Sequence, residues 1–184
     1  MKLNLGCGLR AEEGFLNVDI LDLPTVDQVL NLDVFPYPFE SESIDEVLCR
    51  HFISHIHDIN SLMLELDRVT KYGGILRIYA PHFSSDNYKT DPTHQISIGY
   101  RSLNYFVNDV DWPLTYVKTN LSITYRYLSM FNYDQRKSIK NIFYWTGVEY
   151  IINKFPRIYE KFFSSVIPCN EVYFELRKVE DKDL

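Results

Sequence analysis

The sequence contains few cysteines and no long apolar segment. Its three cysteines, Cys7, Cys49 and Cys169, are spread over 184 residues. Because their number is odd and their spacing is wide, they predict neither a disulfide framework nor a zinc site, and we expect a reducing, cytoplasmic setting. No apolar run reaches the length of about 18 residues that a membrane-spanning helix needs. Met1-Lys2 leads directly into a strand-like stretch, so no signal peptide is expected.

An excess of basic residues is also missing. The formal net charge is −6, whereas a general nucleic-acid-binding surface needs a basic stripe that displaces counterions from phosphates. With 46% hydrophobic and 24% charged residues, the composition excludes a disordered or collagen-like chain. The length is typical of one globular domain, and we expect its substrate to be a small molecule.

The residues that are present are unevenly distributed. Residues 1–80 hold five of the seven glycines and carry a formal charge of −7, while residues 81–184 hold 21 of the 28 aromatic residues. A binding scaffold followed by an aromatic cap has this composition, and so does a plain domain with a large core.

Short apolar stretches alternate with polar turns over the first 80 residues. A helix is predicted at Asn60–Lys71, where apolar residues recur at helical spacing and Tyr72-Gly73-Gly74 marks the end. Strands separated by helices or crossovers indicate a parallel sheet with covered faces. The predicted strands are Leu3–Leu5, Phe15–Ile20, Gln28–Leu32, Ile44–Cys49 and Ile75–Ala80.

The pattern changes after Pro81. Residues 82–101 are polar and loop-like, and a short helix is predicted at Ser102–Val107. Alternation predicts strands at Thr115–Tyr127 and Glu171–Val179, which would pair as an antiparallel edge. Helical spacing covers Gln135–Phe163, with a break at Pro156.

These elements predict one domain over residues 1–184, without repeats or linkers. We expect an α/β fold, a Rossmann-like three-layer sandwich. Its sheet should be mostly parallel and seven-stranded, with an antiparallel C-terminal edge strand.

The most informative motif is the turn Gly6-Cys7-Gly8, which directly follows the first strand. Glycines allow a tight turn and a close approach of the backbone to a ligand. Asp19 and Asp33 close the next two predicted strands at the same edge, where they could bind ribose hydroxyls and an adenine amino group, although each could equally cap a turn. Arg10 stands where a dinucleotide-binding turn has its third glycine, which disfavours NAD.

The order of these motifs resembles a known family, the class I S-adenosylmethionine-dependent methyltransferases. It is closest to the small bacterial and archaeal type-11 members that are often associated with cell-surface sugar biosynthesis. The resemblance covers residues 1–80 well and is thin over 81–169. It is carried by Leu3–Gly8, Gly14–Ile20, Asp33 before Pro36-Tyr37-Pro38-Phe39, Ser43–Cys49, Asp67–Ile78 and Asn170–Leu176.

The resemblance implies S-adenosylmethionine as the cofactor and assigns it a set of residues. Gly6, Cys7 and Gly8 would flank its methionine part. Asp19 would bind the ribose with Ile20 against the adenine, and Asp33 would bind the adenine amino group with Val34 beside the ring. Arg50 and His51 would contact the methionine portion.

The sequence departs from the family in three places. Asn4 replaces a frequent acidic residue, and Ser54 replaces a glutamate. Only ten residues separate Gly8 from Asp19, fewer than a parallel crossover with a helix normally needs. We therefore expect at most a single turn around Ala11–Glu13, and a cofactor site that is open on one side or covered from elsewhere.

Histidine is the natural base near neutral pH if the acceptor is a hydroxyl group. His51 and His82 follow two predicted strands at the ligand-binding edge, and Asp91 could orient His94. These four residues are the catalytic candidates. His55 and His57 cannot share one helix face, so one of them should lie at the surface. No metal-ligand spacing is present, and no metal is expected.

The aromatic second half has two possible uses. Some of its rings could wall a substrate pocket. The candidates are Tyr100, Tyr105, Phe106, Trp112, Tyr125, Tyr127, Phe131 and Tyr133.

The other use concerns the helix predicted at residues 135–163, which is apolar nearly all round. Burial or a homodimer through these C-terminal helices is favoured over membrane contact, because basic residues are not concentrated there in the sequence.

The sequence therefore predicts a methyltransferase in which residues 1–80 bind the cofactor, 81–169 select the substrate and 170–179 form the last strand. The expected acceptor is a hydroxyl group of a small metabolite or sugar. A non-catalytic S-adenosylmethionine-binding partner subunit and an NAD-dependent enzyme are the alternatives.

Overall fold

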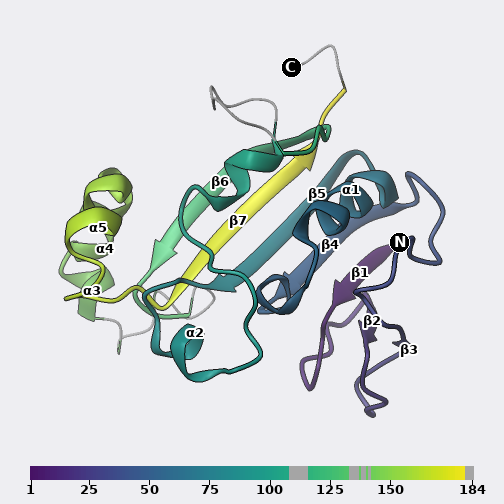
Figure 1. The fold of residues 1–184 in the computed structure, drawn as a ribbon, viewed down its shortest axis with the longest axis horizontal. Helices are drawn as coiled ribbons and strands as arrows, with labels where there is room; N and C mark the ends of the chain where they lie inside the picture. Colours follow the sequence, from purple (N-terminus) through teal and green to yellow (C-terminus); the bar gives the residue numbers. More distant parts are fainter. Residues whose placement is uncertain (108–115, 133–136, 138–139, 141, 181–184) are drawn as a thin grey trace.

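A computed structural model describes residues 1–107, 116–132 and 142–180, together with Lys137 and Lys140. Its strands and helices are shown in Figure 1. The strands are β1 (Lys2–Leu5), β2 (Leu16–Asp19), β3 (Gln28–Val29), β4 (Ile44–Arg50), β5 (Thr70–Pro81), β6 (Leu121–Ser129) and β7 (Glu171–Lys178). The α-helices are α1 (Ile59–Val69), α2 (Asp86–Thr90), α3 (Ile142–Trp145), α4 (Val148–Lys154) and α5 (Pro156–Phe162), and the 3-10 helices are η1 (Ile53–His55) and η2 (Ser102–Phe106).

The strands form one seven-stranded sheet in the order β3-β2-β1-β4-β5-β7-β6. Strands β1 to β5 pair in parallel, whereas β7 is antiparallel to both β5 and β6. This confirms the predicted Rossmann-like α/β class with a mostly parallel sheet. The C-terminal strand β7 is inserted between β5 and β6, so β6 lies at the edge.

The main core lies on one face of the sheet. Leu3 and Leu5 on β1 point to this face, as do Leu76 and Ile78 on β5, and all four are buried. Helix α1 supplies Leu62, Met63, Leu66 and Val69 to the same core. Its amphipathic spacing and its N-cap, Asp58, which accepts from the backbone N–H groups of Asn60 and Ser61, explain why it forms here.

The opposite face carries a smaller cluster of Leu48, Tyr79 and Tyr173, with Phe15 and Tyr127 packed against it. No described helix joins β1 to β2. The crossover makes only a turn in which the Phe15 N–H bonds the Glu12 carbonyl oxygen, as the short spacing predicted.

A buried amide network holds this crossover. The Asn4 Nδ2 group donates to Asn17 Oδ1 (2.8 Å), which also accepts from the Glu12 N–H. The Asn17 amide in turn donates to Asp27 Oδ2 at 2.9 Å. These hydrogen bonds connect β1 and the loop after it to β2 and to the loop before β3. They hold the turn after β1 in place, a role that a helix packed on the sheet usually has.

Several predicted boundaries are wrong. The chain passes from α1 directly into β5, so Tyr72-Gly73-Gly74 lies inside a strand. Thr70 ends the helix in an extended conformation, with its N–H bonded to Leu66. The strand predicted at 28–32 is reduced to Gln28–Val29.

The second half also differs in detail. Residues 82–101 contain helix α2. The strand expected from Thr115 begins at Leu121 and continues to Ser129, and Thr115 itself lies outside the described residues.

The long helix expected over 135–163 is three short helices where it is described. They are broken by Gly147 in the left-handed conformation as well as by Pro156. None of the described helices is both long enough and apolar enough to span a bilayer.

Replacing Asn17 by Ala should lower the free energy of unfolding by about 2 kcal/mol, because Asn4, the Glu12 N–H and Asp27 lose a common partner in a largely buried place. Urea unfolding measures this. Asn60→Ala, at an exposed position, is the matched control and should change stability by less than about 0.5 kcal/mol.

The same pair of variants has an expected pH dependence. Hydrogen bonds from Asn17 hold the pKa of Asp27 below its usual range. The resulting stability is complete above an ordinary aspartate value of about 4 and disappears as the pH falls through the lowered value. Alanine keeps the larger contribution, the hydrogen bond from the backbone N–H of residue 17 to Asp27, and removes only the one from the side-chain amide. The difference between wild type and Asn17→Ala should therefore shrink modestly on acidification. A difference independent of pH would contradict the role of Asp27.

Candidate cofactor and acceptor site

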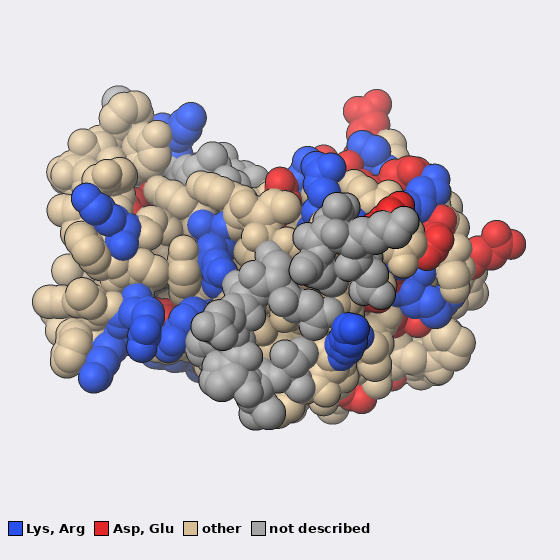
Figure 2. Space-filling view, turned by 90° about the horizontal axis from the view of Figure 1, so that it is seen from above, with Lys and Arg blue, Asp and Glu red and all other residues tan. Residues whose placement is uncertain are grey.

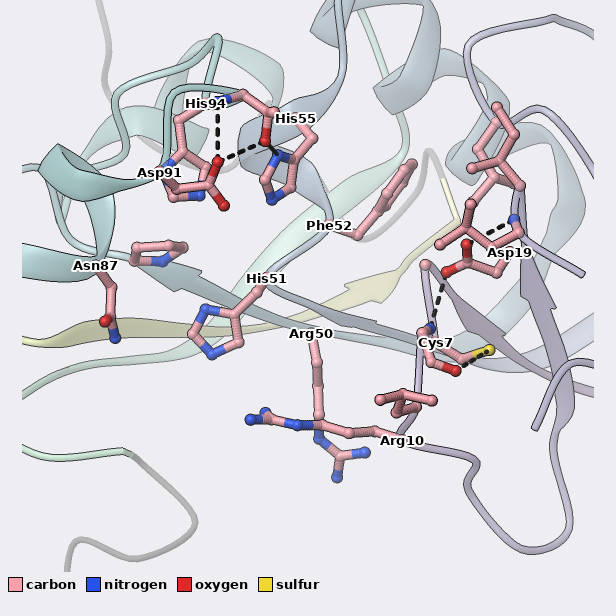
Figure 3. A pocket seen from close by; sticks show the side chains of 18 of the residues that line it. Cys7, Arg10, Asp19, Arg50, His51, Phe52, His55, Asn87, Asp91 and His94 are labelled. Atoms are coloured by element: carbon pink, nitrogen blue, oxygen red, sulfur yellow. Dashed lines mark hydrogen bonds between the residues drawn. The ribbon is translucent and has the colours of Figure 1, made fainter. Parts of the chain in front are cut away.

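A cavity of about 1100 Å³ opens at the edge of the sheet where the parallel strands end. One end is formed by the turn after β1 and the ends of β2 and β3, and the other by α2 and the loop after it (Figure 3). His51 and Phe52, which follow β4, lie between them. Its volume is at the upper end of the range for small-molecule sites.

The turn after β1 is shaped by two glycines with positive φ. Gly6 has φ +67°, and a Cβ there would lie 2.6 Å from Cβ of Phe52. The turn therefore packs directly against the chain that leaves β4, at a distance that only glycine permits. Gly8 has φ +51° and open space around it, so its backbone faces the cavity without obstruction.

Asp19, at the end of β2, braces this turn. Its Oδ2 accepts from the Gly8 N–H at 2.8 Å and its Oδ1 accepts from the Leu21 N–H at 3.0 Å. Although the residue is 8% exposed, it lines the cavity. Each oxygen keeps a second acceptor position, so the carboxylate is available to a ligand hydroxyl group.

The next predicted residues divide into those that reach the cavity and one that does not. Ile20 is 58% exposed and lines the cavity, as does Asp33. Asp33 accepts from the backbone N–H of His57 at 2.9 Å and lies 3.0 Å from its ring Nδ1. Val34 is not among the lining residues and points into solvent, because the turn after Asp33 carries it outward. His57 is the histidine expected at the surface.

Cys7 and two arginines complete this end. Burial raises the pKa of the Cys7 thiol, so the residue acts as a small apolar group beneath the turn. The Arg50 guanidinium pairs with Glu12 at 2.7 Å and lies over the Tyr79 ring. Arg10 also lines the cavity, and the two cations provide a place for an anionic group.

His51 is held in an unusual geometry. It adopts φ +57°, a left-handed conformation that is rare for a non-glycine residue, and its N–H bonds the Tyr79 carbonyl oxygen. Its Nε2 lies 2.8 Å from Oε1 of Glu171, which is buried at the start of β7. When His51 is neutral, donation from Nε2–H to this carboxylate leaves the Nδ1 lone pair available.

The far end of the cavity brings together His55, Asp91 and His94. One ligand atom from each lies within 4.8 Å of the others, and the two imidazole rings are 4.5 Å apart between centroids. Two hydrogen bonds from Thr93 hold the pKa of Asp91 below its usual range. This group is the part of the described chain that could hold a divalent ion, although no ligand spacing in the sequence indicated it.

His82 does not reach the cavity, contrary to the prediction. Its side chain is 0% exposed and lies between Ser84 Oγ, 2.8 Å from Nδ1, and Glu160 Oε1, 3.3 Å from Nε2. The chain turns inward after Pro81, so this histidine joins the loop packing instead.

The described residues of the predicted aromatic wall do not line this cavity, although Tyr100 lines a separate groove beside α5. Phe52 is the one Phe, Tyr or Trp that lines the described cavity. Tyr105 stacks on Tyr116, and Tyr125 and Tyr127 pack near Tyr173. Trp112 and Tyr133 lie outside the described residues.

Other residues of the site were missed from the sequence. Glu171 lies within the recognised Asn170–Leu176 motif, but its contact with His51 could not be predicted, because the two residues are distant in sequence and meet only through the pairing of β5 with β7. Phe52 follows Arg50 and His51, and Arg10 follows the glycine turn, so their place beside these motifs could have predicted that they line the cavity. Asn87, Thr90 and Asn132 come from segments without a motif.

Residues 4–78 match the family model described as a methyltransferase domain. Solved structures similar to this chain include a methyltransferase dependent on S-adenosylmethionine from Archaeoglobus fulgidus. It is 18% identical with a TM-score of 0.57, and the match covers 96% of this chain and 85% of that one. Residues 4–78 are thus similar to a methyltransferase domain, and the whole chain shares the fold of S-adenosylmethionine-dependent methyltransferases. The match supports S-adenosylmethionine as the cofactor.

Two further methyltransferase structures share the fold. One, from Mesorhizobium loti, is 12% identical with a TM-score of 0.55 and coverages of 96% and 89%. The other, a phosphoethanolamine N-methyltransferase from Haemonchus contortus in complex with S-adenosylhomocysteine, is 18% identical with a TM-score of 0.52 and coverages of 97% and 48%. No curated protein sequence matches the chain significantly.

Alanine at the two glycines of this methyltransferase turn should have different effects. Gly6→Ala combines left-handed strain with a clash against Phe52 and should cost at least about 3 kcal/mol of stability. Gly8→Ala carries the strain alone, about 1 kcal/mol, but its methyl group enters the cavity and should weaken cofactor binding. Thermal unfolding and titration calorimetry with S-adenosylhomocysteine separate the two. Equal destabilisation by both variants would contradict the close packing of Gly6 on Phe52.

Proposed function

We propose that this protein transfers a methyl group from S-adenosylmethionine to a hydroxyl group of a small polar acceptor, such as a sugar. The observation that carries the proposal is the His51–Glu171 pair. His51 lines the same cavity as the glycine turn and Asp19, between the proposed cofactor end and a polar end, and the buried Glu171 holds its ring from behind.

Specific residues at the first end suit the cofactor. The Asp19 carboxylate would bind the ribose hydroxyls, with Ile20 packed against the adenine and Asp33 accepting from its amino group. Gly6, Cys7 and Gly8 would border the methionine portion, and Arg50 would lie near its carboxylate together with the His51 backbone. The open glycine turn and the aspartate oxygens that point to the cavity support this arrangement.

The other end of the cavity suits a hydroxyl-rich acceptor. It is lined by Asn87, Thr90, Thr93, Asp91 and His94, which offer both donors and acceptors of hydrogen bonds. Asp91 and His94, predicted as catalytic, fit acceptor contact here. Polar side chains at this end favour a sugar or similar hydroxyl-bearing metabolite over a flat aromatic compound.

The chemistry needs positioning and one proton acceptor. When bound, S-adenosylmethionine supplies a methyl group already activated by its sulfonium. The acceptor oxygen would take the methyl group as its bond to the sulfonium sulfur breaks, and His51 Nδ1 would accept the hydroxyl proton. Glu171 holds the imidazole in the tautomer that accepts it and stabilises the resulting cation.

The alternative of a non-catalytic partner subunit is not favoured. It predicts that the protein binds S-adenosylmethionine but forms no S-adenosylhomocysteine with any acceptor offered.

Removing the Asp19 charge tests the cofactor end. Asp19→Asn keeps the size of the side chain and should weaken S-adenosylmethionine binding at least about tenfold, because the amide loses an acceptor oxygen toward the ribose. Titration calorimetry measures it. The control is Asp22→Asn, on the exposed loop after β2, which should leave the affinity unchanged. Equal affinity of wild type and Asp19→Asn would refute the assignment.

Replacing His51 tests the chemistry. His51→Asn tolerates the left-handed backbone but offers no base, and it should lower the methylation rate by a factor of about 10²–10⁴. Cofactor affinity should stay within about threefold. The readout is S-adenosylhomocysteine formation over a panel of sugar acceptors. Glu171→Gln should lower the rate less. No turnover by wild type, despite cofactor binding, would instead favour the partner-subunit alternative.

A further inference from the structure

A large apolar surface is exposed where the chain leaves the sheet at β6 and returns at β7. It is formed by α4, α5 and the turn that follows, and we call it the α4–α5 surface. Phe162 is 61% exposed and Val166 is 76% exposed. Its other main apolar members are Ile151, Phe155, Ile158 and Phe163.

Such a surface is unusual on a protein in water. Several of these side chains surround an apolar depression of about 350 Å³ whose lining exposes no polar atoms. Contiguous exposed apolar surface of this kind marks a binding face.

The exposed charges on this surface all have one sign. Lys154, Arg157 and Lys161 are exposed, whereas the two acidic residues between positions 142 and 168, Glu149 and Glu160, are not. Glu149 is buried and accepts from the Met130 N–H, and Glu160 accepts from the Tyr100 N–H. Figure 2 shows the result: blue side chains lie among uncharged ones on the side of α3–α5, while most visible red ones lie on the opposite side.

The cations of this surface lie directly beside its aromatic rings. The Lys161 ammonium lies 5.0 Å from the Phe162 ring centroid and the Lys154 ammonium lies 5.7 Å from that of Phe155. A groove of about 930 Å³ runs beside them, and Arg126 from β6 and Arg157 join its lining. Its one acidic lining residue is Glu160, which is largely buried and accepts from the Tyr100 N–H. Basic side chains that flank apolar rings are the arrangement by which interfacial helices bind phospholipid headgroups above buried apolar side chains.

We propose that the α4–α5 surface docks on a bilayer that contains anionic phospholipids. Phe155, Ile158 and Phe162 enter the boundary of the acyl chains, and Lys154, Arg157 and Lys161 bind the lipid phosphates. The helices are short and lie in the plane of the interface; they do not cross it. This property goes beyond the proposed methyl transfer and does not depend on it.

The charge pattern favours a membrane over a second copy of the chain. A symmetric dimer through this surface would bring the same three exposed cations of each copy together, with only the largely buried Glu160 as an acidic residue in the groove, which is unfavourable. The sequence favoured burial or a homodimer over membrane contact, because the basic residues of this segment are not concentrated along the chain. The fold concentrates them, since Arg126 on β6 lies in one groove with Lys154, Arg157 and Lys161.

The surface also lies at the ligand-binding edge of the sheet. Its last turn leads to Glu171, the first residue of β7 and the partner of His51.

Vesicle flotation tests the proposal. The full chain is mixed with phosphatidylcholine vesicles with and without 30% phosphatidylglycerol, at low and high salt. Wild type should float with the anionic vesicles and be released by salt. Ile158→Ser with Phe162→Ser should lower binding by more than about tenfold, and alanine at Lys154, Arg157 or Lys161 by about fivefold each.

Matched variants distinguish this surface from unspecific adhesion. Leu64→Ser removes an exposed apolar residue of α1, and Lys118→Ala removes an exposed cation that precedes β6. Both should bind vesicles like wild type. All replaced side chains are exposed, and a thermal-unfolding midpoint close to that of wild type confirms folding.

Trp145 provides a second readout. It is 63% exposed beside the surface, and Trp112→Phe leaves it as the single tryptophan. Its emission should shift to the blue with anionic vesicles and not with neutral ones. The absence of vesicle binding by wild type, or binding unchanged in Ile158→Ser with Phe162→Ser, overturns the proposal. So does a dimer that Phe162→Ser dissociates while vesicles have no effect.

Discussion

The carboxylate of Asp19 joins the two turns on which the cofactor end of the cavity depends. By accepting from Gly8 and Leu21, it links the turn after β1 to the chain that leaves β2. Gly6 packs that turn on Phe52 and so connects it to the end of β4. Three neighbouring strands therefore end in one rigid assembly, and the residues after them, Ile20 and His51, are placed by backbone geometry. This is the usual reason why ligands bind at the carboxyl edge of a parallel sheet.

The missing helix after β1 shows how such an assembly is kept with less chain. A helix would orient the turn by packing on the sheet. Here the amides of Asn4 and Asn17 and the carboxylate of Asp27 do this through hydrogen bonds, and Arg50 reaches the loop through Glu12. The replacement of an acidic residue by Asn4 thus has a structural meaning, since Asn4 Nδ2 donates where a carboxylate could only accept. Because the crossover from β1 to β2 contains no helix, it occupies little space beside the cavity of about 1100 Å³.

The second half of the chain contributes differently from what its aromatic content indicated. Most of its described rings lie in the core, on the sheet face of Tyr79 and Tyr173, or on the α4–α5 surface. The residues that it adds to the cavity are polar, such as Asn87, Asp91 and His94. Glu171 belongs to this half as well, and it connects the last strand to the proposed chemistry. The proposed acceptor site is made from loops and the proposed cofactor site from strand ends, which agrees with the thin family resemblance over residues 81–169.

The sequence by itself determined the class of fold, and it predicted the family resemblance and the proposed cofactor end of the site, because these depend on local features. Glycines, alternating apolar residues and an aspartate at a strand end have the same physical meaning wherever they occur. It did not determine the ends of α1 and β5, because Gly73 and Gly74 are compatible with a strand once neighbouring strands pair with it. Only the tertiary structure decided that His82 is buried, that His51 pairs with Glu171, and that His55 meets Asp91 and His94. It also gathered Arg126 with Lys154, Arg157 and Lys161 beside an apolar surface. Each of these depends on contacts between residues that are far apart in the chain, and no local pattern encodes them.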